Sequence, residues 1–326
     1  MTDTSMAALS DTLFSVSVAL YSVALVAFCA ELAFGRRSGA APRRAVSVAA
    51  AGATTGTAGG GVLLADRPSD DEDVATRRSN RWGVLALAVT VLGALAHAGV
   101  LVTRGLAADR LPWGNMYEFA TAVVLVAVVA FTAFAVRSPA LRHIGVFVLA
   151  PVILGLVAIG LGLYTEAAPV VAALRSYWLA IHVTAAILGF GIFLVSGIAS
   201  ILYLVRSRPG AEEGTGFVSR LPSAAALDRL AHRTAVFGFP IWTFAVIAGA
   251  IWAEAAWGRF WGWDPKETWS FVAWVVYAAY LHARTTAGWR GRPAAWVNVV
   301  GLVVMIFNLT FVNLVSTGLH SYAGVN

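Results

Sequence analysis

The chain alternates long apolar runs with shorter polar connections. Eight runs are long enough to cross a bilayer as helices, since about 20 apolar residues span the hydrocarbon core. Only structures that satisfy their own backbone hydrogen bonds cross lipid, so the pattern predicts an all-α polytopic membrane protein. The runs lie at roughly 12–34, 82–103, 116–136, 144–164, 177–205, 234–253, 267–284 and 295–315.

One further stretch, 46–65, is long enough to span but is rich in Gly, Ala and Thr and poor in large apolar residues. An acidic tract, 70–73, follows it closely. We interpret 46–65 as part of a flexible cytoplasmic loop. The chain then divides into an N-terminal helix with its loop, 1–81, and a membrane domain, 82–326.

Basic residues are unevenly distributed among the connections. Of the 23 lysines and arginines, 18 fall in alternate loops, at 36–81, 137–142, 206–233 and 284–292. Because cytoplasmic loops carry the excess of Lys and Arg, these loops are predicted inside and both termini outside. Only 12% of residues are charged, against about 25% in soluble domains. The net charge of +6 therefore reflects membrane orientation, and we expect no nucleic-acid partner.

The predicted outer loop 254–268 is rich in tryptophan. It includes the run W-G-R-F-W-G-W-D from Trp257 to Asp264. Indole rings offer flat faces that stack on a planar π-system, and glycines allow a backbone to approach closely. An aromatic belt at the membrane surface is the alternative interpretation. The ordered spacing favours a platform for a flat ligand, while Asp264 and Glu267 also suit the start of a helix.

The pattern W-G-x-x-W-x-W-D resembles the signature of haem-handling membrane proteins of cytochrome c biogenesis. Segments 112–118, 176–183 and 318–322 are similar to the CcsA family of the System II pathway, also called ResC or actinobacterial CcsB. In the first of these, Trp113 and Gly114 replace Leu and Ser of the family pattern. The resemblance covers about 104–326.

This resemblance implies a function. The chain would be the membrane subunit of a holocytochrome c synthase, or haem lyase, in a bacterial plasma membrane. It would carry haem b as a bound substrate to the extracytoplasmic face and present it for thioether ligation to a CxxCH apocytochrome c. The expected partners are a ResB-type subunit, the apocytochrome and, indirectly, thioredoxin-like thiol reductants. Whether the chain is itself an enzyme stays open, since no catalytic residue is indicated.

Histidines are the predicted iron ligands, because a neutral imidazole binds haem iron well. His182 and His320 are expected on the outer face with the tryptophans, and both match family positions. His282 lies near the inner end of the seventh helix, where a polar residue is costly. By resemblance it is an intramembrane ligand on the haem entry side. The remaining predicted haem contacts are Trp257, Trp261, Trp263 and Asp264.

Other interpretations of these histidines remain. His182 can be a buried polar residue bonded to a neighbour, and His320 a solvated tail residue. His282 can reach the inner interface. His97, which matches no motif, is interpreted as a packing residue in the second helix.

Four outer arginines are candidate partners for the two haem propionates, since arginine pairs well with carboxylates. They can equally be charges that keep the loops hydrated. They are Arg104, Arg110, Arg175 and Arg259.

Two other functions compete with haem attachment. The first is a haem exporter or carrier without attachment activity, because other haem-handling proteins share the tryptophan motif. The second is a b-type electron-transfer protein. That class usually holds haem between histidine pairs at two depths of a four-helix bundle, whereas the predicted ligands here lie on scattered helices and loops.

Overall fold

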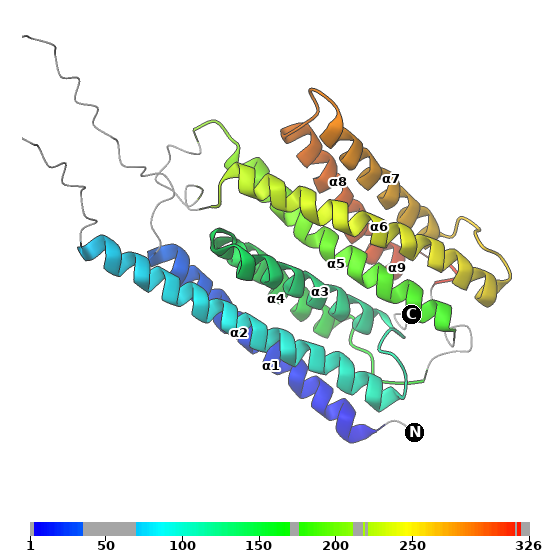
Figure 1. Cartoon of the computed structure of the whole chain (residues 1–326). Helices are drawn as coiled ribbons and strands as arrows, with labels where there is room; N and C mark the ends of the chain where they lie inside the picture. Colours follow the sequence, from blue (N-terminus) through cyan, green and yellow to red (C-terminus); the bar gives the residue numbers. More distant parts are fainter. Residues whose placement is uncertain are drawn as a thin grey trace, which may run out of the picture.

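The computed structural model describes residues 3–34, 70–169, 176–210, 218, 221–316 and 318–320, and within these the secondary structure is helical without strands. Figure 1 shows the long helices lying side by side along one axis. The elements are α1 (Thr4–Phe34), α2 (Asp70–Ala108), α3 (Met116–Arg137), η1 (Pro139–Ile144), α4 (Gly145–Gly162), α5 (Tyr177–Arg206), α6 (Ala224–Trp257), α7 (Pro265–Thr285), α8 (Arg292–Leu309) and α9 (Phe311–Leu314).

Seven spans among the described helices are long and apolar enough to cross a membrane. They include α1 to α6, with η1 joined to α4, and the run of α8 and α9. Helix α7 is not among them, because it carries polar residues at both ends. Its 21 residues still extend about 32 Å, which is enough to cross the hydrocarbon core. The prediction of an all-α polytopic membrane protein with about eight spanning helices is confirmed.

The helices form two packed groups. One core lies among α1 to α4 and includes Tyr21, Phe28 and Phe131, all fully buried. The other lies mainly among α5 to α8, where the rings of Phe193 and Tyr277 stack with centroids 3.5 Å apart. Helix α5 joins the two, since it contacts α3 on one side and α6 and α8 on the other.

Hydrogen bonds between side chains connect neighbouring helices inside the bundle. The Asn298 amide on α8 donates to the hydroxyls of Ser196 and Ser200 on α5, each at 2.8 Å. His97, interpreted from the sequence as a packing residue, is fully buried, with Nδ1 3.2 Å from the Tyr21 hydroxyl. In lipid such contacts contribute modestly, about 0.6 kcal/mol each.

The alternation of loops matches the predicted topology. Helix α1 begins and α9 ends at the same end of the bundle, together with the α2–α3 and α6–α7 connections (Figure 1). Helix α5 ends and α6 begins at the opposite end, where the α7–α8 connection also lies. Which end faces the cytoplasm stays a prediction from the arginine distribution. The stretch 46–65 lies outside the described residues.

Several element bounds differ from the prediction. Helix α6 begins at Ala224, ten residues before its apolar run, because the Ser223 hydroxyl accepts a hydrogen bond from the Ala226 N–H and caps it. At its other end α6 continues through Trp257, so the tryptophan-rich loop is 258–264 and not 254–268. The run 295–315 is interrupted at Thr310, between α8 and α9.

Candidate functional site

The site begins where α6 ends. Gly258 adopts a left-handed conformation, φ 71°, and its N–H donates to the Glu254 carbonyl at 2.8 Å. Glycine is favoured in this capping conformation because it has no Cβ. Trp257 is therefore held rigidly on the last helical turn.

The loop from 258 to 264 is organised by the start of α7. Asp264 caps this helix, and Glu267 returns the contact in a capping box. The Glu267 carboxylate accepts from the N–H groups of Gly262 at 2.8 Å and Asp264 at 3.0 Å, and it lies 3.4 Å from the Arg259 guanidinium. A side chain at Gly262 would collide with Arg259. The two loop glycines thus shape the loop itself, where the sequence had indicated a close approach to a flat ligand.

Asp264 also connects the loop to the C-terminal segment. It accepts hydrogen bonds from the Leu319 N–H and from Nδ1 of His320, both at 2.8 Å. Burial acts to raise the pKa of Asp264, but the hydrogen bond from His320 and those from the backbone outweigh it and hold the pKa below its usual value. The acid therefore remains a carboxylate beside the imidazole.

His320 is held as a neutral imidazole. Burial lowers its pKa below the ordinary value, although the hydrogen bond to Asp264 opposes that shift. Because the carboxylate only accepts, the His320 proton lies on Nδ1 and Nε2 is the nitrogen with a donor electron pair.

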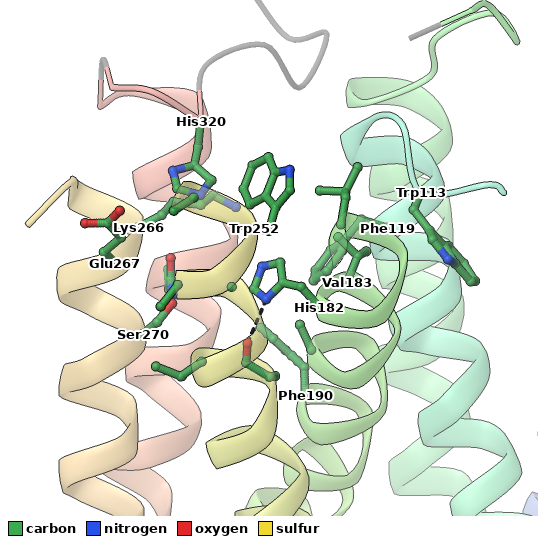
Figure 2. A pocket seen from close by; sticks show the side chains of 18 of the residues that line it. Trp113, Phe119, His182, Val183, Phe190, Trp252, Lys266, Glu267, Ser270 and His320 are labelled. Carbon is green, nitrogen blue, oxygen red and sulfur yellow. Dashed lines mark hydrogen bonds between the residues drawn. The ribbon is translucent and has the colours of Figure 1, made fainter. Parts of the chain in front are cut away.

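His182, on the second turn of α5, is fixed in the same way. Its Nδ1 donates to the Ala245 carbonyl of α6 at 2.8 Å, which again makes Nε2 the electron-pair donor (Figure 2). The ring fits against α6 because residue 249 is glycine. A Cβ there would lie 2.7 Å from Cε1 and Nδ1 of His182.

Trp252 joins the two imidazoles. Its indole is nearly parallel to the His182 ring, with centroids 6.0 Å apart, and lies edge-on to the His320 ring at 5.8 Å. The imidazole centroids are therefore no farther apart than the sum of these distances. Trp257 completes the cluster, at 4.9 Å from His320 and 4.8 Å from Trp252.

These side chains line one cavity at the end of the bundle, shown in Figure 2. Its empty volume is about 1140 Å³, a figure that includes the open solvent at its mouth. Aromatic rings from three other segments complete much of its wall: Trp113 from the α2–α3 connection, Phe119 from α3, and Trp261 from the loop. The arrangement offers a largely apolar, aromatic-lined space with two imidazole nitrogens.

Three of the predicted haem contacts do not line this cavity. Asp264 is bonded to Nδ1 of His320 and is not in the cavity wall. Trp263 has φ 58° and a side chain that is 64% exposed. It contacts the rings of Trp261 and Phe271 and not the cavity wall. His282 is exposed near the other end of α7, about 25 Å along the helix from its first turn.

The outer arginines have structural partners that the sequence did not indicate. Arg104 is 1% exposed and donates to Glu118 at 3.0 Å, and Arg110 contacts the same carboxylate at 2.7 Å. They neither hydrate the loops nor point into the cavity, because the buried Glu118 requires a positive partner. Arg259 lies over Trp257 and beside Glu267. Arg175 lies outside the described residues.

Known proteins resemble this chain over most of its length. Residues 71–320 match the family of cytochrome C assembly proteins. The chain is 35% identical over 305 residues to the cytochrome c biogenesis protein CcsA of Gloeobacter violaceus, which covers 76% of this chain and 89% of the relative. It is 34% identical over 261 residues to the CcsA of Guillardia theta, which covers 73% of this chain and 85% of that relative.

Proposed function

This chain belongs to the cytochrome c assembly protein family, and we propose that it is the subunit that presents haem at the outer face for attachment. Haem b is the bound substrate, and the thiols of a CxxCH apocytochrome c add across its vinyl groups to form thioethers. A ResB-type subunit is the expected partner. The observation that carries the proposal is the meeting of His182, His320 and five tryptophans around one cavity.

The imidazoles are suited to bind iron. Each donates its Nδ1 proton to a fixed acceptor, a carbonyl for His182 and a carboxylate for His320. Such partners hold the ring orientation and raise the basicity of Nε2, the usual arrangement behind a metal-binding histidine. Trp252 contacts both rings, so a porphyrin bound by both must lie against its indole.

The protein's contribution is binding and orientation, because the bond-forming thiols belong to the apocytochrome. The chain's single cysteine, Cys29, lies on α1 and not in the cavity wall. The tryptophans on α6 and the loop offer flat apolar faces to the porphyrin. Trp263 does not line the cavity, and its side chain is exposed. A contact between Trp263 and haem would therefore form on the surface of the protein.

The function is tested by co-expressing the chain with a ResB-type partner and a CxxCH reporter in a host that lacks its own maturation system. Staining for covalent haem on the reporter is the measurement, and we expect it only with both proteins. Noncovalent haem without covalent product, with both proteins in the membrane, would support the exporter or carrier function instead.

Gly249→Ala is expected to weaken haem binding by the purified protein about five- to tenfold. The added Cβ would lie 2.7 Å from the His182 ring, so the imidazole must shift and weaken its bond to Ala245, and misplaced ligands lose affinity. Titration followed by visible absorbance checks this. Gly155→Ala on α4 is the control, because its Cβ meets nothing within 4 Å. Equal haem affinities for Gly249→Ala and Gly155→Ala would contradict the expected fit of the His182 ring against Gly249.

A further inference from the structure

Lys266 is the only lysine in the chain, and it lines the cavity from the first turn of α7. Its ammonium lies 6.0 Å from the ring centroid of Phe119 on α3, so the side chain reaches across the cavity wall. Figure 2 shows it beneath His320, on the same side as Glu267.

The nearest acids are committed to other donors. Asp264 accepts from His320 and from the backbone of Leu319 and Lys266. Glu267 accepts from two backbone N–H groups and lies beside Arg259. Within the described part of the chain, no carboxylate lies within ion-pairing distance of the Lys266 ammonium.

Lys266 is half-buried, and an ammonium that is partly removed from water without a paired anion is costly. A weak interaction with Phe119 at 6.0 Å offsets only part of that cost. The cost falls when a ligand brings an anion into the cavity. The cavity is therefore suited to a flat apolar molecule that carries a carboxylate.

We propose that Lys266 binds a propionate of the haem and so fixes how the macrocycle is oriented in the cavity. The inference rests on the proposed function, because it assigns one contact of that same substrate. In haem b the propionates and the vinyl groups lie on opposite edges of the ring. Anchoring a propionate at Lys266 directs the vinyl edge away from α7. The thiols of an apocytochrome then have to reach the macrocycle on the side that faces away from α7.

The other cations near the cavity are less suited to this role. Arg104 and Arg110 are occupied by the buried Glu118. Arg259 is 32% exposed, does not line the cavity and lies beside Glu267. Lys266 is thus the cation that the described residues leave for a ligand.

The test compares ferric haem with its dimethyl ester, which has the same ring and no propionate charge. Each is titrated into purified wild type, Lys266→Leu and Lys266→Arg, followed by absorbance. Leucine is chosen because methionine can itself bind haem iron. Arg137→Leu removes a charge at the opposite end of α3, where its guanidinium bonds only its own helix, and serves as the control.

We expect wild type to bind haem about 10- to 100-fold more tightly than the ester, as befits a charged hydrogen bond. Lys266→Leu should lose this preference while its ester affinity stays within about twofold, and Lys266→Arg and Arg137→Leu should keep it. Three outcomes would overturn the inference alone: an unchanged preference in Lys266→Leu, an equal loss of both ligands, or no preference in wild type. Failure of wild type to bind either porphyrin would overturn the proposed function as well.

Discussion

Replacing both His182 and His320 by alanine is expected to abolish six-coordinate haem in the purified protein, and each single variant should lower haem affinity at least tenfold. The reason is geometric. Both rings line one cavity, contact the same indole, and use Nδ1 for a fixed hydrogen bond. Each therefore has Nε2 as the nitrogen that can bind iron.

Absorbance spectra of the purified variants are the measurement, and covalent haem on a CxxCH reporter should fall in parallel. His232→Ala is a control, since that ring packs against Tyr280 on the α6–α7 interface, away from the cavity. His282→Ala should leave the affinity of the outer site unchanged and lower only delivery in cells, because it lies near the opposite end of α7. Unaltered spectra in both single variants would show that other residues hold the iron.

The sequence predicts well where an apolar run ends at a clear cap. The runs 116–136 and 177–205 agree with α3 and α5 to within a residue, because Asn115 and Ser176 accept hydrogen bonds from the first turns. It predicts poorly where a helix continues into polar surroundings. The first turns of α6 carry charged residues between Leu227, Leu230 and Ala231, so they form an amphipathic segment and not an unbroken apolar run.

The same distinction holds for the site. Motif residues such as His182 and His320 could be selected in advance, and the structure brings them together at one cavity. Trp252 was missed because it lies inside a membrane run, where a tryptophan is ordinary. Lys266 is the sole lysine, but no motif or spacing assigns it a role. Its place in the cavity depends on Phe119, which lies 147 positions earlier in the chain.

The charge pairs, too, could not be predicted from the sequence. Arg104 and Glu118 lie on separate helices and meet only because the loop between α2 and α3 folds back. In the sequence alone, nothing about Arg104 indicates that Glu118 is its partner. Because Arg104 and Arg110 pair with Glu118, they are removed from the predicted propionate ligands. The proposed ligand, Lys266, is identified by its position in the cavity.

Asp264→Asn is expected to lower haem affinity about 10- to 100-fold while the protein stays folded, since carboxylate partners of metal-binding histidines typically contribute that much. The amide oxygen can still accept hydrogen bonds from the Lys266 N–H and from Nδ1 of His320, but the amide nitrogen cannot accept from the Leu319 N–H as Oδ2 does in the wild type. The amide cannot supply the negative charge that now faces the imidazole at 2.8 Å. The loss of affinity therefore combines a lower basicity of Nε2 with the loss of the Leu319 hydrogen bond, and thermal unfolding reports the structural part.

The measurement is haem titration together with thermal unfolding of the ligand-free protein. Ser223→Ala provides the control, because it removes the cap of α6 at the opposite end of the bundle, at a cost of about 1 kcal/mol, without touching the cavity. If Asp264→Asn lowers thermal stability as Ser223→Ala does but binds haem like wild type, then Asp264 acts only as a helix cap. If haem affinity falls while unfolding is unchanged, the carboxylate acts through the imidazole, and the acid that ends the tryptophan motif is there to hold the ligand at position 320.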